Sequence, residues 1–251
     1  MTQGTVYLVG AGPGAPDLLT LRAARLLERA DIVFYDALVH PDSLALAQRA
    51  ERVAVGKRCG RHSTAQRFIN KRLVDAARKH HTVVRLKGGD PMLFGRAQEE
   101  LAALHAAGIE VEVVPGVTAA LAASADLRIS LTQRGLARSV TFLTPRVGAG
   151  EKSNEWARAA ASADTAVIYM GAGEAEKIAT TLIAHGVPAA TPVIVVENAS
   201  LPDARQLKLA LGDLPSVAGL GLSGPAVILV GAVYGEAVAA AARSVQAARS
   251  A

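Results

Sequence analysis

Short apolar runs alternate with helical patterns along the whole chain, and this rhythm limits the possible folds more than any other feature. The runs are rich in β-branched residues and end in glycine or polar residues, as buried strands do. Strands are expected at 6–9, 31–35, 53–55, 83–86, 111–114, 140–143, 165–169, 193–196, 207–209 and 226–230. Helices are expected at about 19–27, 43–49, 63–79, 95–107 and 119–125, near 156, up to 185, and after 231 with fraying beyond 243. This alternation predicts an α/β protein.

The length of 251 residues is enough for two compact α/β domains. Hydrophobic residues make up 51% of the chain, so a sizeable core is available. The segment 126–138 has no clear helix or strand pattern and is suited to cross from one domain to the next. We therefore expect an N-terminal domain at 1–125 and a C-terminal domain at 126–251.

Glycine-rich or polar segments follow six of the expected strands. In open α/β sheets, ligands bind beyond the carboxyl ends of the strands. Segments far apart in sequence can therefore contribute to one site. The segments are Gly10–Gly14, Asp36, Gly88–Asp90, Pro115–Thr118, Met170–Gly171 and Glu197–Ala199.

The stretch 85–100, RLKGGDPMLFGRAQEE, is the densest of these candidates. The glycines of Gly88-Gly89-Asp90 allow a ligand to approach the backbone closely, and a carboxylate follows them at once. Arg96 and Glu99 are three residues apart and share one face of the expected helix. The stretch alone fits a binding site and a tight connection with a surface ion pair equally well.

Positive charge is concentrated in one part of the chain. The net charge is +5 and the sequence pI is about 9.6, with the excess between Lys57 and Arg96. Such a field favours an anionic partner, namely nucleic acid, phosphate or a polycarboxylate. For 67–79 a solvated helix face is the simpler explanation.

Several other classes of site lack their signature. The six histidines, at 40, 62, 80, 81, 105 and 185, show no metal-ligand spacing, so surface or capping roles and no bound metal are expected. The single cysteine, Cys59, excludes an internal disulfide and a cysteine zinc site. The chain contains neither a P-loop nor a nucleophile elbow. Covalent catalysis is therefore not expected.

The chain also lacks the signals of membrane insertion and secretion. No apolar run is long enough to cross a bilayer, and the N-terminus has no signal-peptide features, so a cytoplasmic location is expected. The Gly10–Gly14 turn follows a strand, as in nucleotide-binding proteins, but it departs from G-x-G-x-x-G. Pro13 also removes an N–H that a pyrophosphate would use. A non-catalytic dinucleotide-binding module is kept as an alternative.

Eight segments in collinear order give a more specific result. Together they closely resemble the tetrapyrrole methylase family, and within it the uroporphyrinogen-III C-methyltransferases. The segments are VYLVGAGPG (6–14), LLTLRA (18–23), YDALV (35–39), GKRCGRHS (56–63), RLKGGDPMLFGR (85–96), VVPGVTAA (113–120), VIYMG (167–171) and VVENAS (195–200).

The resemblance implies two α/β domains with S-adenosylmethionine in the cleft between them, in a homodimer. It implies methylation of uroporphyrinogen III at C2 and C7, giving precorrin-2 via precorrin-1. By motif position, the cofactor would be bound by Pro13, Gly88, Gly89, Asp90, Thr118, Ala119, Met170, Ala199 and Ala226. The substrate would be bound by Asp36, Arg96, Glu99 and Met170, and the first three of these are the catalytic candidates.

The chain departs from the family pattern on the expected substrate side. Ala15 stands where most members carry an acid, Gln133 and Gly135 replace a histidine and an aspartate, and Thr144-Pro145-Arg146 replaces a common TGH. The chain has no room for a fused dehydrogenase/ferrochelatase domain, so the methyltransferase alone is expected. The other alternative is a methylase of this fold acting on a later precorrin, on RNA or on a protein. RNA is less favoured, because the basic stretch lacks the regular aromatic interleaving that base stacking would use.

Overall fold

The computed structural model describes residues 3–56, 66–148 and 155–250. The chain forms two compact units, residues 1–119 and 120–251. The expected domain boundary after residue 125 lies inside helix α5 (Ala119–Leu127), whose residues Ala120, Ala122 and Ala123 are buried in the core of the second unit. That boundary stays a prediction.

The first unit is built on a five-stranded sheet. Its strands are β1 (Thr5–Gly10), β2 (Ile32–Tyr35), β3 (Glu51–Ala54), β4 (Thr82–Lys87) and β5 (Val111–Val114). They lie in the order β3-β2-β4-β1-β5, and every neighbouring pair is parallel. All carboxyl ends therefore lie at one edge. This confirms, for the first unit, that the segments after β1, β2, β4 and β5 share an edge.

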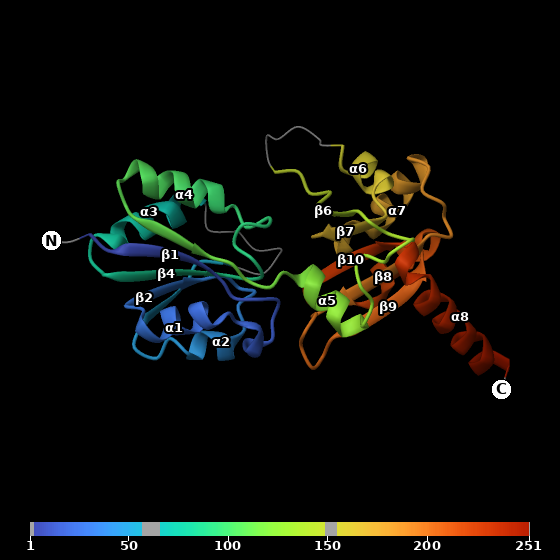
Figure 1. Ribbon diagram of the computed structural model, residues 1–251, viewed down its shortest axis with the longest axis horizontal. Coiled ribbons are helices and arrows are strands. Elements are labelled where there is room, and N and C mark those ends of the chain that lie inside the picture. Colours follow the sequence, from blue (N-terminus) through green and yellow to red (C-terminus); the bar gives the residue numbers. More distant parts are fainter. Residues whose placement is uncertain (1–2, 57–65, 149–154, 251) are drawn as a thin grey trace. The chain divides into compact units, whose positions relative to one another are not determined.

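Helices cover both faces of this sheet. Helices α1 (Leu21–Arg29) and α2 (Pro41–Ala45) lie on one face, and α3 (Gln66–Ala77) and α4 (Ala97–Ala106) lie on the other (Figure 1). Successive side chains of β4 point to opposite faces of the sheet. Val83 therefore packs in the core under α3 and α4, and Val84 packs in the core under α1. The inner strands β1, β2 and β4 are mostly buried and read as nearly continuous apolar runs, which is why the sequence located them.

Local capping fixes where these helices begin. Helix α1 begins at Leu21 because the hydroxyl of Thr20 accepts a hydrogen bond from the Ala23 N–H at 3.1 Å. His40 caps α2, since its Nδ1 accepts from the Asp42 N–H at 3.2 Å, which confirms a capping role for that histidine. Helix α4 begins at Ala97, close to the start expected near Gly95, and Arg96 before it has a left-handed backbone with φ 55°.

The second unit also has a five-stranded sheet, but a mixed one. Its strands are β6 (Val140–Leu143), β7 (Thr165–Tyr169), β8 (Pro192–Glu197), β9 (Arg205–Ala210) and β10 (Ala226–Gly231). They lie in the order β6-β7-β10-β8-β9. Strands β6 and β7 are parallel, whereas β10 is antiparallel to both of its neighbours and β9 to β8. Strands β6, β7 and β8 therefore end at the edge where β9 and β10 begin.

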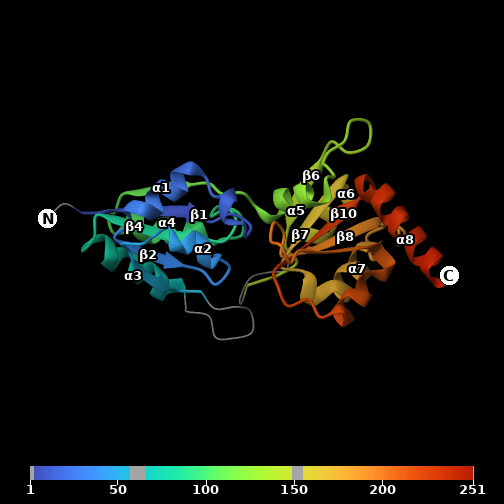
Figure 2. The same cartoon turned by 90° about the horizontal axis from the view of Figure 1, so that it is seen from below.

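The two faces of the second sheet are covered differently. One face packs against α6 (Trp156–Ser162), α7 (Ala175–Ala184) and the 3-10 helix η3 (Leu211–Leu220). The other packs against α5, the 3-10 helix η4 (Ala232–Tyr234) and the start of α8 (Gly235–Ser250). The expected fraying of α8 after Arg243 is wrong, because the helix continues to Ser250 through strong helix formers. Figure 2 shows its C-terminal half projecting past the sheet.

Candidate active site

Three glycines bring backbone segments together at the carboxyl-end edge of the first sheet. A Cβ added to Gly10 would lie 2.6 Å from the Cα of Gly116 and 2.7 Å from the carbonyl oxygen of Gly89. Gly12 and Gly89 exchange two backbone hydrogen bonds, at 2.7 and 3.2 Å. Any side chain at Gly10 or Gly116 would separate these segments, so the turns after β1, β4 and β5 form one closely packed backbone cluster.

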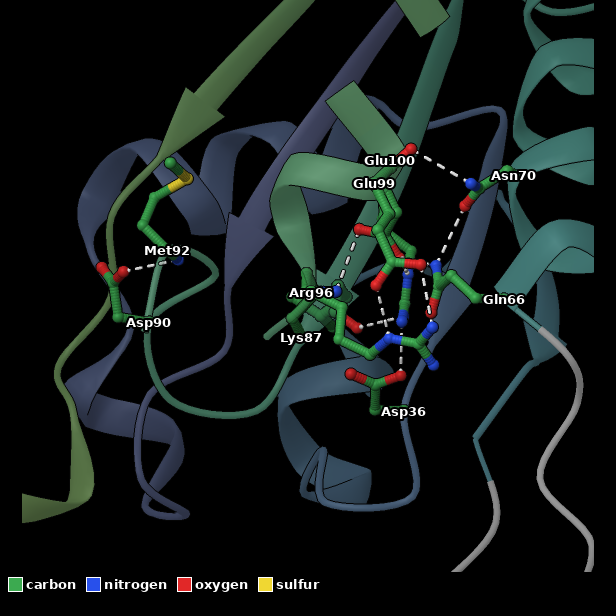
Figure 3. A network of polar contacts seen from close by, with 11 residues as sticks. Asp36, Gln66, Asn70, Lys87, Asp90, Met92, Arg96, Glu99 and Glu100 are labelled. Atoms are coloured by element: carbon green, nitrogen blue, oxygen red, sulfur yellow. Dashed lines mark hydrogen bonds and ion pairs between the residues drawn. The ribbon is translucent and has the colours of Figure 1, made fainter. Parts of the chain in front are cut away.

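Asp90 braces this cluster. Its Oδ1 accepts the Met92 N–H at 2.8 Å, and its Oδ2 accepts the Gly116 N–H at 2.9 Å. The carboxylate thus ties the loop after β4 to the exit of β5, and Figure 3 shows the bond to Met92. The structure therefore gives Asp90 a bracing role. The cofactor contact predicted for it stays a prediction, as it does for Gly88 and Gly89.

A buried ionic cluster lies under α4, beside this edge. We use "buried ionic cluster" for Asp36, Arg85, Lys87 and Glu100. Arg85 donates to Glu100 at 3.0 Å and to Asp36 at 2.6 Å, and Lys87 donates to Glu100 at 2.9 Å. Gln66 adds a hydrogen bond to Glu100 at 3.1 Å. Figure 3 shows the Asp36, Lys87 and Glu100 side chains converging, together with Gln66.

Burial dominates the electrostatics of this cluster. The Glu100 side chain is fully buried, and those of Arg85 and Lys87 are only 3% and 4% exposed. Burial lowers the pKa of Lys87, and the positive charge of Arg85 lowers it further, while Glu100 opposes the shift. Such an arrangement persists only because every charge is paired.

Arg96 and Glu99 form a second ion pair, on the exposed side of the same helix. The Arg96 Nε and Nη2 donate to the two carboxylate oxygens of Glu99 at 2.7 and 2.8 Å. The side chains are 58% and 50% exposed. The hydrogen bond from Arg96 lowers the pKa of Glu99. This pair fixes the plane of the guanidinium, and it confirms that Arg96 and Glu99 lie side by side.

The remaining candidates of the first unit lie at the same edge. Pro13 follows the β1 turn and is half-buried, and Thr118 follows β5 and is 9% exposed. Ala119 is the first residue of α5. The structure therefore gathers the candidates from 13, 36, 88–90, 96–99 and 118 at one edge of the first sheet. Their binding roles stay predictions.

The candidates of the second unit also gather at one edge. Met170 follows β7 directly, and Ala199 lies two residues after β8. Ala226 opens β10 and pairs with Glu197 at the end of β8. Ala226 therefore joins this edge from the beginning of an antiparallel strand, whereas Met170 and Ala199 join it from strand ends. Their roles as cofactor ligands, and that of Met170 toward substrate, stay predictions.

Backbone at this second edge adopts an unusual conformation. Met170, Asn198 and Ser200 have φ of 57°, 53° and 71°, values that side chains disfavour. Such residues cluster at ligand sites, where the surrounding structure holds them in place. Glu197, which is 2% exposed, accepts the N–H groups of Ser223 and Gly224 at 2.6 and 2.7 Å. This clamp holds the loop before β10 against the end of β8.

The sequence did not single out the buried side chains of Arg85, Lys87 and Glu100, and it named Glu197 only as part of the segment Glu197–Ala199. Arg85 and Lys87 were counted as part of a general basic field. Their spacing in a run that is otherwise apolar was the available signal, because alternate residues of a strand face the same side. Glu100 falls between the apolar Ala97 and Leu104 on the buried face of α4, which is the second signal.

The basic helix face is solvated, as expected. Arg67 and Lys71 of α3 and Arg78 just after it are exposed, and Lys71 pairs with Asp75 at 2.6 Å. Residues Lys57, Arg58 and Arg61 of the same basic stretch, and the start expected for this helix at 63, lie outside the described residues.

The turn after β1 does not form a dinucleotide site of the usual kind. The 3-10 helix η1 (Pro16–Leu18) separates Gly14 from α1, and Thr20 caps the first turn of α1. A pyrophosphate site would need the turn to open directly into a helix N-terminus. This geometry disfavours the dinucleotide-binding alternative.

Two of the departures from the family pattern lie in a tight turn. Gln133 and Ala137 exchange backbone hydrogen bonds at 2.8 and 2.9 Å, and Gly135 between them has φ 81°. Glycine suits this left-handed position better than an aspartate does. At Thr144-Pro145-Arg146, another of these departures, the Thr144 hydroxyl accepts the Arg146 N–H at 3.2 Å.

Residues 3–56, 66–148 and 155–250 contain no group of three or more metal-binding side chains. Within the same ranges, no helix is long and apolar enough to cross a membrane.

Comparison with known proteins identifies the family. The model described as Tetrapyrrole (Corrin/Porphyrin) Methylases matches residues 5–215. The chain belongs to the tetrapyrrole methylases. The resemblance drawn from the sequence motifs and the expected fold type are therefore confirmed.

Individual tetrapyrrole methylases are similar over most of this chain. Uroporphyrin-III C-methyl transferase from Thermus thermophilus, solved in its native form and with S-adenyl homocysteine, is 43% identical with a TM-score of 0.81. That match covers 92% of this chain and 98% of the Thermus chain. A cobalt precorrin-4 methyltransferase is 30% identical with a TM-score of 0.80, over 91% of this chain and 95% of that chain.

A siroheme synthase from Nitrosococcus oceani is 45% identical over 233 residues, which is 92% of this chain and 50% of the relative. This tetrapyrrole methylase chain thus spans about half the length of the curated relatives it matches.

Proposed function

We propose that this chain transfers methyl groups from S-adenosylmethionine to C2 and C7 of uroporphyrinogen III, giving precorrin-2 via precorrin-1. The observation that carries the proposal is the match to uroporphyrin-III C-methyl transferase, at 43% identity over 98% of that chain. Candidate residues at each sheet edge support it. The activity is proposed for this chain alone, whatever further activity the longer siroheme synthases have.

The residues at both edges fit S-adenosylmethionine. A Cβ added to Gly89 would meet no atom within 4 Å, and its φ is +68°, so a ligand can approach this backbone closely. At the second edge, the left-handed backbone of Met170 and Asn198 turns peptide groups out of the regular strand direction. The residues that would hold the cofactor are Pro13, Gly88, Gly89, Asp90, Thr118, Ala119, Met170, Ala199 and Ala226.

The basic and acidic side chains suit a reduced tetrapyrrole. S-adenosylmethionine supplies a methyl group that is already activated on a sulfonium, so the protein mainly aligns the reacting carbon. Arg96 is held flat by Glu99 and would bind a carboxylate of the substrate by charge-assisted hydrogen bonds. Asp36 would accept a pyrrole N–H, and Met170 would contact the ring system.

Asp36 would also stabilise the charge that develops during transfer. When a pyrrole carbon gives its electron pair to the methyl carbon, the bond to sulfur breaks and its pair stays on sulfur. The positive charge then passes to the pyrrole ring. A carboxylate that accepts the ring N–H stabilises this charge, and the ring later releases a proton.

A later precorrin is the second candidate substrate. The cobalt precorrin-4 methyltransferase has nearly the same TM-score, 0.80, so the fold also supports that class. Its identity of 30% is lower than 43%, and this difference favours uroporphyrinogen III.

A product assay tests the proposal. Purified chain is incubated anaerobically with uroporphyrinogen III and S-adenosylmethionine, and the tetrapyrrole is analysed by mass spectrometry and NMR. The expected product has gained two methyl groups, at C2 and C7. If the tetrapyrrole is unchanged, but calorimetry shows that S-adenosylhomocysteine binds and NAD does not, uroporphyrinogen III is not the substrate. The chain would then still be interpreted as a methylase. The predicted homodimer is measured in the same preparation by light scattering.

A further inference from the structure

Arg85 stands where a charge is hard to accommodate. It lies within β4, and its side chain is 3% exposed. Val83 precedes it on the same face of the strand and belongs to the core under α3 and α4. An arginine at such a position must be paired, and it destabilises the fold when a partner is removed. The role of Arg85 can therefore be inferred from the groups with which it pairs.

The guanidinium of Arg85 is fixed on two sides. Its Nε donates to Glu100 at 3.0 Å, and its Nη1 donates to the Leu86 carbonyl oxygen at 3.2 Å. Its Nη2 then donates to Asp36 Oδ1 at 2.6 Å. Because the guanidinium is planar, the first two bonds determine the direction in which Nη2 points. Glu100 thus orients Arg85, and Arg85 orients Asp36.

Asp36 is the end of the cluster that reaches solvent. Its side chain is 28% exposed, whereas those of Arg85, Lys87 and Glu100 are 4% exposed or less. It lies just past the carboxyl end of β2, at the ligand edge of the first sheet. A single short bond from a fixed donor therefore sets the direction of a carboxylate that a ligand can reach.

We propose that Arg85 is a positioning residue for methyl transfer, holding the Asp36 carboxylate in the orientation that receives the pyrrole N–H. The inference rests on the proposed function. A carboxylate that is already oriented stabilises the charge on the ring without reorganising during the reaction. Lys87 shares the strand, the burial and the partner Glu100 with Arg85, and it feels the charge of Asp36, but among the described residues only Arg85 forms an ion pair with Asp36. It is therefore the matched control.

A double-mutant cycle tests this role. Arg85→Lys, Asp36→Asn and the double variant are compared with the unchanged chain for kcat and KM with uroporphyrinogen III. S-adenosylhomocysteine affinity is measured by calorimetry. Arg85→Lys and Asp36→Asn are each expected to lower kcat about tenfold to hundredfold, because small misplacements have such effects, and to leave the cofactor affinity unchanged. The double variant should be no slower than Asp36→Asn, since Arg85 acts through Asp36.

The control separates positioning from stability. Lys87→Met should lower the unfolding midpoint while its kcat stays near the unchanged value. If the two single effects multiply in the double variant, or if the kcat of Lys87→Met falls in step with that of Arg85→Lys, the positioning role is wrong.

Two further measurements keep the test decisive. If Arg85→Lys does not fold, Asp36→Glu replaces it, because it keeps the charge but moves the carboxylate by one methylene. An unchanged kcat in Asp36→Glu would overturn the inference, and a loss of about tenfold would support it. If the unsubstituted chain makes no methylated product, the proposed function itself is wrong. If that chain is active but the effects of the two single substitutions multiply in the double variant, only the positioning role of Arg85 is wrong.

Discussion

Adjacent glutamates on helix α4 hold two arginines in opposite environments. Glu100 binds Arg85 in the core, where both side chains are 3% exposed or less, and Glu99 binds Arg96 at the surface, where both are at least half exposed. The two arginine–glutamate pairs have similar hydrogen-bond lengths, 3.0 Å in the core and 2.7 Å at the surface. Their energetics differ because burial removes the solvent that would otherwise screen and hydrate the charges.

This difference separates structural from ligand-binding roles. Removing one partner of a buried pair is strongly destabilising, so we expect Glu100 to stabilise the fold of the first unit. An exposed pair contributes little to stability, so stability alone does not account for the alignment of Arg96 and Glu99. We therefore propose that the surface pair binds substrate and that the buried pair supports Asp36.

The largest expected effect is on stability, from Glu100→Gln. The substitution keeps the shape of the side chain but leaves Arg85 and Lys87 without their shared carboxylate. The free energy of unfolding should fall by about 3–5 kcal/mol, as for other broken buried pairs. Urea unfolding followed by circular dichroism measures it.

Glu99→Gln is the matched control for that experiment, because it makes the same chemical change one residue earlier in the helix. It should lower the unfolding free energy by less than about 1 kcal/mol. Equal losses for the two variants would show that the buried ionic cluster has no special role in stability, and would remove the contrast between the pairs.

The sequence predicted the strands better than their directions. Runs such as 165–169 and 226–230 are apolar and β-branched whichever way they run, so the local pattern located β7 and β10 but did not reveal that they are antiparallel. Strand direction depends on pairing between distant segments. The carboxyl-end rule therefore held for the all-parallel first sheet, and the antiparallel start of β10 brought Ala226 to the second edge.

The candidate site was found from the sequence only in part. Asp36, Arg96 and Glu99 came from motif resemblance, and the structure places them near one edge. The roles of Arg85 and Glu100 were missed because ion pairing between a strand and a helix is a tertiary property. A basic residue in a strand looks the same in sequence whether it faces solvent or a buried carboxylate.

The second expected effect is on the rate, from Arg96→Lys. A planar guanidinium binds a carboxylate with two aligned hydrogen bonds, whereas lysine offers a point charge. S-adenosylhomocysteine affinity should be unchanged, and methylation should lose roughly 1.5–3 kcal/mol of transition-state stabilisation, about tenfold to hundredfold in rate. Steady-state assays of the lysine variant measure the loss.

Glu99→Gln tests the same arrangement from the other partner. If Glu99 acts by holding Arg96, its substitution should slow methylation similarly, and the double variant should be less than additive. A lysine variant with unchanged turnover would show that the pair is only a surface ion pair.

The smallest expected effect is the pH dependence of the surface pair. The hydrogen bond from Arg96 lowers the pKa of Glu99 in the folded state, so the unfolded state binds more protons as the solution becomes acidic. The stability from this pair is therefore present above the ordinary glutamate pKa of 4.5 and is lost as pH falls through the lowered value.

Because the pair is half exposed, solvent screening should limit its contribution to under about 1 kcal/mol. Urea unfolding of the unchanged chain and of Glu99→Gln at pH 7 and at about pH 3 measures the difference between the two chains. That difference should shrink in acid, and it should also shrink in high salt at pH 7. A stability difference that persists in both conditions would show that Glu99, like Glu100, has a structural role. Stability alone would then explain the alignment of Arg96 and Glu99, without a bound ligand.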